Sequence, residues 1–151
     1  MREAEQVRYL ILAAQREGNR RLIAELKPLS LTPAQAEVLR ILGENPALTL
    51  TGVGQMLVCD SGTNPSRIVD RLVDAGLVDR TTAVEDRRQI RLTLTAAGED
   101  RERAVRNIED NLYADIDQLG DVTGLIAQLH AIISEQPSGE ALKKRMSGAR
   151  H

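Results

Sequence analysis

Aromatic side chains are almost missing from this sequence, which has no phenylalanine, no tryptophan and only two tyrosines among 151 residues. A hydrophobic core must therefore be built from leucine, isoleucine, valine and alanine, and such a core favours helix packing over an aromatic-rich sheet sandwich. The length suits a single domain over residues 1–151 with a sizeable buried interior. We expect a mainly α fold with a small β-hairpin.

Cysteine and long apolar runs are also scarce. Cys59 is the only cysteine, so an internal disulfide is excluded, which agrees with a reducing compartment. The sequence contains no run of about 18 apolar residues, and its charged N-terminus is not followed by the apolar stretch of a signal peptide. We therefore expect a cytoplasmic protein with no membrane partner.

Residue types that build common active sites are few. The two histidines are His130 and His151, and the sequence shows no Cys/His metal spacing, no phosphate-binding glycine loop and no nucleophile elbow. These absences argue against an enzyme, and they predict neither a metal site nor a cofactor.

The net charge of −2 does not by itself favour a nucleic-acid partner, but the charge is unevenly distributed. Counting lysine and arginine against aspartate and glutamate gives zero for residues 1–61, +1 for 62–98, −5 for 99–121 and +2 for 122–151. Arginine outnumbers lysine by 17 to 3. Arginine is the better bidentate partner of guanine and phosphate, although a GC-rich genome gives the same bias.

Residues 63–95 combine a helical pattern with a hairpin pattern. An apolar face contains Ile68, Val69, Leu72 and Val73, and a polar face contains Ser66, Arg67, Asp70, Arg71 and Asp74. Gly76 is placed to end the helix, because glycine readily adopts the left-handed conformation of helix C-termini. Leu77–Thr82 and Gln89–Leu94 predict two strands, and the loop Ala83–Arg88 between them is long enough to project as a wing. A helix beside such a wing can fill two neighbouring DNA grooves.

Capping signals and apolar periodicity predict the helices before this segment. The first spans residues 2–27. The second begins at Thr32-Pro33-Ala34-Gln35, a capping box with proline at the first helical position, and runs to about Gly43. A short helix over Leu50–Val58 contains two glycines, and the next helix covers roughly Gly62–Ala75. These last two have the dimensions of a helix-turn-helix, with Ser61 or Asn64 as the cap of the second.

Long terminal helices are expected to make a dimer. Thr95 is placed to cap a helix to about Leu119, Asp121 to cap a further helix, and the tail after Pro137 is interpreted as frayed or partly helical. Their apolar stripes are either buried within one chain or paired with a second copy, and we expect a two-fold dimer because DNA half-sites repeat about every 10 to 10.5 base pairs. The expected interface residues are Val7, Leu10, Ile11, Ile108, Leu112, Ile116, Leu125, Leu129 and Ile132.

Four motifs occur in an informative order. They are Leu31-Thr32-Pro33-Ala34-Gln35, the block DRLVDAGLVDR from Asp70 to Arg80, Glu85-Asp86-Arg87-Arg88, and Leu94-Thr95-Ala96-Ala97-Gly98. With their flanks they cover residues from about 30 to 120, and together they resemble the MarR family of winged-helix transcriptional regulators. The resemblance implies a winged helix-turn-helix core over about 30–98, with dimerisation helices over about 2–27 and 96–135.

The resemblance also implies a cytoplasmic homodimer that binds double-stranded DNA at a pseudo-palindromic operator. Such a protein often represses transcription and often releases DNA when a small phenolic or other aromatic acid binds. By position, Thr63, Asn64, Ser66 and Arg67 would approach base edges in the major groove, and Arg71 would meet a phosphate or an intramolecular partner.

In the wing, the resemblance matches Asp86 to a carboxylate that steadies the hairpin and Arg88 to an arginine that enters the minor groove. Arg87, between them, is expected to contact DNA as well. The plainer alternative is a charged hairpin tip in water. For Arg67 and Arg71 the alternative is a solvated helix surface on which they pair with neighbouring aspartates.

Other candidate sites have plainer alternatives too. Cys59 is more often a small buried residue than a redox sensor, because no second cysteine is present to resolve a sulfenic acid. Residues that could line an effector pocket, each equally an ordinary interface or surface residue, are Tyr9, Arg16, Arg20, Tyr113 and His130. The alternative function is a winged-helix dimer that acts as a protein–protein adaptor without binding DNA.

Overall fold

The computed structural model describes residues 1–59, 64–82 and 89–148. The chain begins with a long helix, α1 (Glu3–Leu26), and a short 3-10 helix, η1 (Lys27–Leu29). Helix α2 (Pro33–Glu44) follows and begins at the expected capping box. The Thr32 hydroxyl accepts the Gln35 N–H at 3.2 Å, and the Gln35 side chain accepts the Thr32 N–H at 2.9 Å. The predicted start of this helix is confirmed.

Helices α3 (Leu50–Met56) and α4 (Pro65–Asp74) form the helix-turn-helix. Both are shorter than the sequence predicted, and α4 begins at Pro65 instead of near Gly62. The choice between the two caps falls on Asn64, whose side-chain oxygen accepts the Ser66 N–H at 2.9 Å. Proline is tolerated directly after such a cap, because the first helical N–H has no partner within the helix.

The hairpin is formed by β2 (Val78–Thr82) and β3 (Ile90–Leu94), which pair antiparallel with Arg80 opposite Leu92. A two-residue strand that the sequence analysis missed, β1 (Leu48–Thr49), pairs with the other edge of β3, so the sheet order is β1-β3-β2. Leu92 is 1% exposed, whereas Ile90 is 54% exposed. The alternation predicted for this strand therefore buries its middle residue and not its outer end, which extends past β1.

Three helices complete the chain: α5 (Ala96–Asp117), α6 (Thr123–Ile133) and α7 (Pro137–Gly148). Helix α5 begins at Thr95 as predicted. Asp121 accepts the Thr123 N–H at 2.9 Å at the start of α6, although Val122 is the formal cap residue. Of the two alternatives given for the tail, frayed or partly helical, the structure shows the helical one, because α7 is a 12-residue helix that packs against α3.

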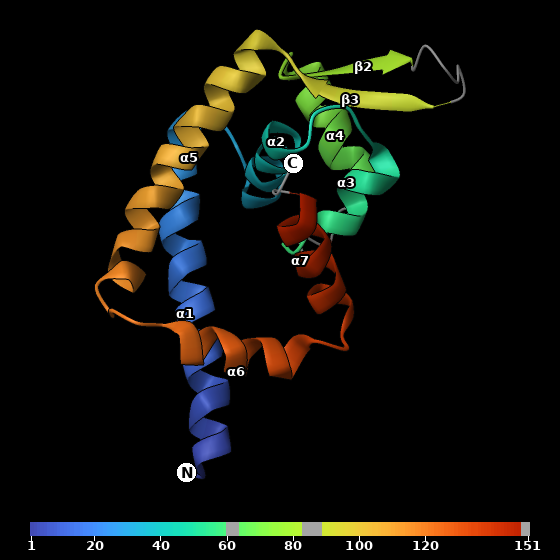
Figure 1. The fold of residues 1–151 in the computed structure, drawn as a ribbon. Coiled ribbons are helices and arrows are strands. Elements are labelled where there is room, and N and C mark those ends of the chain that lie inside the picture. Colours follow the sequence, from blue (N-terminus) through green and yellow to red (C-terminus); the bar gives the residue numbers. More distant parts are fainter. Residues whose placement is uncertain (60–63, 83–88, 149–151) are drawn as a thin grey trace.

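The elements divide into a packed region, formed by α2, α3, α4 and the sheet, and the long helices α1, α5 and α6, which extend away from it (Figure 1). Helices α1 and α5 lie side by side, α6 crosses near α1, and α7 returns to the helix-turn-helix. The buried core is centred on α2, α4 and β3, with contributions from the end of α1 and from α5. In the described part of the chain no helix is long and apolar enough to cross a membrane.

Candidate nucleic-acid interface

Helix α4 has one buried face and one exposed polar face. Ile68, Val69 and Leu72 are at most 4% exposed and join the core, which fixes the rotation of the helix. Arg67 and Arg71 lie on the exposed face. Within the described residues neither arginine forms an ion pair or a side-chain hydrogen bond, so both guanidinium groups are available to an external partner.

The plainer alternative for these arginines was pairing with the neighbouring aspartates of the same helix. The structure shows instead that Asp70 pairs with Arg80 of strand β2. This contact pairs one carboxylate of α4 with an arginine and links α4 to the hairpin. Asp74 remains exposed at the far end of the helix.

The C-terminal end of α4 is closed by Gly76, whose φ of +71° confirms the predicted left-handed conformation. The Leu77 N–H donates to the Leu72 carbonyl and the Gly76 N–H donates to the Val73 carbonyl, both at 2.9 Å. This is the paired hydrogen-bond pattern of a Schellman motif. The reversal leads the chain directly from the buried face of α4 into β2.

The start of α5 is attached to the same reversal. The Thr95 hydroxyl donates to the Gly76 carbonyl at 2.7 Å, and the Thr95 N–H donates to the Leu77 carbonyl at 3.1 Å. A Cβ at Gly98 would lie far inside van der Waals contact of the Leu77 carbonyl oxygen. The Leu94-Thr95-Ala96-Ala97-Gly98 motif therefore has a structural reason: it holds α4, the hairpin and α5 together at one joint.

The other end of the helix-turn-helix is held by a residue that the sequence analysis missed. Glu37 of α2, 8% exposed, accepts the N–H groups of Val58 and Cys59, the residues that lead from α3 towards α4. Arg145 of α7 donates to the same carboxylate at 2.9 Å. No local pattern could have indicated this contact, because the partners are 108 residues apart.

The predicted DNA contacts Thr63, Arg87 and Arg88, and the predicted wing-structural residue Asp86, lie outside the described residues. Next to the wing, Arg91 has a structural role. Its guanidinium donates to the Ala47 carbonyl at 3.0 Å and to the Gln89 side chain at 3.2 Å. Arg91 therefore fixes β3 to the loop before β1.

Most of the apolar residues assigned to a dimer interface are exposed in the single chain. Ile108 and Leu112 are half-buried, and Ile108 packs against the core. Exposed fractions between 38% and 68% are found for Val7, Leu10, Ile11, Ile116, Leu125, Leu129 and Ile132. An apolar hollow of about 410 Å³ lies where α1 meets α6, and Ile11 and Ile132 are among its lining residues.

A charged cluster joins α2 to α5. Arg40, whose side chain is 12% exposed, pairs with Glu44 at 2.8 Å, with Glu109 at 2.9 Å and with Glu102. Burial acts to lower the pKa of Arg40, but the hydrogen bonds that Arg40 donates to Glu102 and Glu109, with the negative charges of Glu109 and Glu44, outweigh it, and the net pKa is raised. Arg106 also pairs with Glu102 at 2.8 Å. The cluster keeps one face of α5 close to α2.

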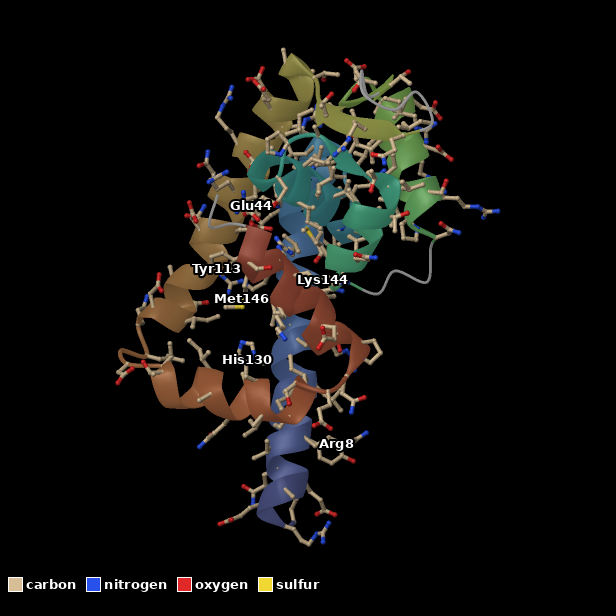
Figure 2. All side chains as sticks on the ribbon, turned by 45° about the vertical axis from the view of Figure 1, so that its right-hand side comes forward. Arg8, Glu44, Tyr113, His130, Lys144 and Met146 are labelled. Atoms are coloured by element: carbon tan, nitrogen blue, oxygen red, sulfur yellow. The ribbon has the colours of Figure 1, made fainter. Side chains whose placement is uncertain are left out.

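The five candidate effector residues do not form a single cluster in the chain. In Figure 2, Tyr113 of α5, His130 of α6 and Met146 of α7 lie on the sides of these helices that face one another. Burial, followed by the negative charge of Glu109, raises the pKa of the Tyr113 hydroxyl.

The three candidates on α1 are exposed. The Arg8 guanidinium lies 5.2 Å from the centre of the Tyr9 ring, and Arg20 pairs with Glu17 at 2.8 Å. Arg16, like Tyr9 and Arg20, is exposed on the surface of the single chain.

A larger cavity lies elsewhere, between α3, the start of α4 and the first half of α7. Its volume is about 840 Å³, and none of the five predicted effector residues lines it. Its apolar wall includes Leu57, Val58, Pro65, Ile68, Pro137 and Ala141, and its polar wall includes Gln55, Cys59, Ser138, Glu140 and Lys144.

Comparisons with known proteins agree with this geometry. Residues 31–90 match the family model for MarR. The organic hydroperoxide resistance transcriptional regulator of Bacillus subtilis (strain 168) is 32% identical over 98 residues, which are 65% of this chain and 66% of that protein, just under two thirds. None of the relatives compared is named as an enzyme, and they give no support to a protein–protein adaptor.

Two solved structures resemble the whole fold. A crystal structure of a MarR mutant from E. coli in complex with operator DNA is 25% identical, with a TM-score of 0.72 over 87% of this chain and 96% of that chain. Bordetella bronchiseptica BpsR, described with regulation of its DNA binding by 6-hydroxynicotinic acid, is 21% identical, with a TM-score of 0.69 over 87% and 94%. The second likeness shows the fold alone.

The family match covers the helix-turn-helix and most of the hairpin, the segments that carry the exposed arginines and the joint at Gly76. Homodimerisation and repression, which the sequence resemblance implied, fit this family. Residues 31–90 thus match the MarR family of winged-helix proteins, and the chain as a whole is similar to DNA-binding transcriptional regulators of that family.

Proposed function

We propose that two copies of this chain bind a pseudo-palindromic operator, with α4 of each copy in the major groove and each wing in the adjacent minor groove. The observation that carries the proposal is the pair of exposed guanidinium groups of Arg67 and Arg71 on a helix whose opposite face is fixed in the core. A rigid helix presents its side chains in a fixed geometry, as recognition of base edges requires.

The residues of this interface have different tasks. Arg67 and Ser66, near the start of α4, are assigned to base edges, and Arg71, a turn later, to phosphate. Thr63 and Asn64 precede them. The Asn64 side-chain oxygen is occupied by the helix cap, which leaves its NH₂ group as the donor for DNA. Arg87 and Arg88 are assigned to the minor groove.

The proposed dimer is formed by the terminal helices, residues 2–27 and 96–135, around a winged-helix core of about residues 30–98. Its support is the exposed apolar surface of α1 and α6 and the hollow between them. An Ile132→Asp variant is expected to sediment as a monomer and to bind a full operator weakly, because an aspartate buried in an apolar interface loses its hydration. A dimer that persists in this variant would contradict the placement of the interface.

Selection from random double-stranded DNA tests the function as a whole. Enrichment of an inverted repeat is expected, and the absence of any enrichment at low salt would contradict the proposal.

With the selected operator, Arg67→Ala is expected to relax sequence preference. Arg71→Ala is expected to weaken binding to all sequences and to lower the slope of log Kd against log salt by about one. Arg88→Ala is expected to weaken binding at fixed salt without changing thermal stability. The matched control is Arg103→Ala on α5, whose arginine is exposed and paired with Asp100.

We also propose that the protein represses transcription and that a small aromatic or phenolic acid releases it from DNA. The support is the cavity of about 840 Å³ beside α4. Tyr113 and His130, which lie on facing sides of α5 and α6 in Figure 2, are the second candidate place. Tyr9, Arg16 and Arg20 would take part only across a dimer, because they are exposed on α1 of the single chain.

A ligand screen for operator release separates these two places. Ser138→Trp fills the cavity beside α4, and Tyr113→Ala removes the aromatic side chain from the second candidate place, at Tyr113 and His130. The variant that loses its response to the ligand while keeping operator affinity identifies the site, and an unchanged response in both variants would exclude both places.

We further propose that the protein is not an enzyme and that it works in the cytoplasm, because the relatives it matches are named as transcriptional regulators. The part of the chain that the structure describes contains no cluster of His, Cys, Asp and Glu residues that could hold a metal ion.

A further inference from the structure

The last helix of the chain is attached to the helix-turn-helix by polar contacts that the family resemblance did not predict. Arg145 of α7 donates to Glu37 of α2, and Lys144 of α7 donates to Gln55 of α3 at 3.1 Å. Figure 1 shows α7 returning from α6 to the side of α3 that faces away from the hairpin. These residues lie away from the exposed face of α4, so the contacts call for another role.

Glu37 is the centre of these contacts. One carboxylate oxygen accepts the Val58 N–H and the Arg145 guanidinium, both at 2.9 Å, and the other accepts the Cys59 N–H at 2.7 Å. The two amides belong to the residues directly after Leu57, which is the C-cap residue of α3. The carboxylate therefore fixes the position from which the chain departs towards Pro65 and α4.

The Glu37 side chain is only 10% exposed, so its charge depends on its partners. A buried carboxylate loses hydration, and among the described residues Arg145 is the cation that pairs with it, so removing Arg145 leaves a charge supported there by the neutral amide donors. The remaining amides would then have to rearrange around the carboxylate, or the carboxylate would turn towards water. Either movement displaces the Val58–Cys59 segment.

The Glu37–Arg145 contact is also connected, through further ion pairs, to α5, one of the helices of the proposed dimer interface. Arg145 lies 4.0 Å from Glu44, which pairs with Arg40, and Arg40 pairs with Glu109 of α5. Charged side chains thus run without interruption from α7 through α2 to α5.

We propose that Arg145 and Glu37 are positioning residues for DNA binding: they hold the connection between α3 and α4 in a fixed place relative to α5 and α7, without touching DNA. For its effect on affinity, the inference rests on the proposed function. Its effect on the Val58 and Cys59 amides does not.

The test is Arg145→Met, which keeps the length of the side chain and removes its charge. The expected result is faster hydrogen exchange in the peptide that contains Val58 and Cys59, and operator affinity lower by about tenfold. The slope of log Kd against log salt should stay unchanged, because no phosphate contact is lost. Arg145→Lys should recover part of the affinity, and Arg103→Met serves as the matched control.

A second variant keeps the test decisive if the first is poorly folded. Glu37→Gln retains an acceptor for the amides but loses the charge that attracts Arg145, so its effect on affinity should resemble that of Arg145→Met. The double variant should be no weaker than either single variant, because both remove the same interaction.

Three results would overturn the inference. Unchanged exchange at Val58 and Cys59 would show that the pair does not hold the connection. A smaller salt slope in Arg145→Met would show that Arg145 contacts DNA itself, and fully additive losses in the double variant would show that the two residues act separately. If the wild-type protein bound no DNA, the proposed function would fail, and the exchange measurement would still decide whether the pair holds this segment.

Discussion

The winged-helix region and the terminal helices use similar aliphatic residues in opposite ways. Seven of the twelve residues of α2 are buried, whereas Leu26 is the only buried residue among the twenty-four of α1. Helix α6 has no buried residue, although most of its residues are apolar. The winged-helix region satisfies its apolar surface within one chain. The terminal helices leave theirs exposed, as expected of helices that pack against a second copy.

The largest contrast is expected from leucine truncation. Leu72 of α4 is 0% exposed and Leu10 of α1 is 68% exposed. Leu72→Ala should lower the free energy of unfolding by about 2 to 5 kcal/mol, through lost burial and the cavity that remains. Leu10→Ala should change it by less than about 0.5 kcal/mol at protein concentrations where the chain is monomeric. Urea denaturation measures both, and equal losses would contradict the division into two regions.

Ion pairs should show the same contrast with a somewhat smaller effect. Arg40→Met leaves the buried carboxylate of Glu102 with fewer compensating charges and should cost about 3 kcal/mol of unfolding free energy. Arg20→Met removes a pair on α1 whose two side chains are more than 60% exposed, so it should cost about 0 to 1 kcal/mol. A stable Arg40→Met protein would show that the cluster is not needed to join α2 to α5.

Two glycines offer a pair of substitutions with opposite signs. Gly98→Ala places a methyl group against the Leu77 carbonyl, so α5 must shift, at a cost of about 1 to 3 kcal/mol. Gly18 lies within α1 with nothing near an added Cβ, and Gly18→Ala should stabilise the helix by about 0.5 to 1 kcal/mol. Thermal denaturation of the two variants gives the comparison. A stabilised Gly98→Ala protein would mean that the joint is looser than the structure shows.

The smallest effect is expected at the joint between α5 and α6. Hydrogen bonds from Thr123 lower the pKa of Asp121 below its ordinary value of 3.8. Because the folded pKa is the lower one, this stabilisation is complete above the ordinary pKa and is lost as the pH falls through the folded value. Asp121→Asn should therefore show a slightly smaller fall in melting temperature than the wild type on acidification. Identical acid profiles would assign Asp121 no role in the joint.

Local sequence patterns were sufficient where the deciding contacts lie a few residues apart. The capping box at Thr32 and Gln35, the helix end at Gly76 and the start of α5 at Thr95 are each fixed by neighbours within about one helical turn. The hairpin was found from the alternation of apolar and polar residues in its second strand. The residues that end α4 and begin α5 could therefore be identified before the structure was known.

The features that the sequence analysis missed depend on distant partners. Strand β1 has only two residues and exists because β3 pairs with it. The contacts of Arg145 and Lys144 that hold α7 were missed because their partners lie far away in the sequence. The pairing of Asp70 with Arg80 required the register between α4 and β2. Such contacts follow from the tertiary fold and leave no period in the sequence.

The close contact at Gly98 has a consequence for the spacing between the two half-sites of the operator. Since α5 is locked to the reversal after α4, each residue of that helix sets both the separation and the relative rotation of the two DNA-binding heads in the proposed dimer. One added residue would advance the helix by about 1.5 Å and turn it by about 100°, whereas four would lengthen it by about 6 Å and nearly restore its phase. In the proposed dimer, the length of α5 therefore sets the distance between the two DNA-binding regions. Insertions in whole turns should select operators with a longer spacer between the half-sites.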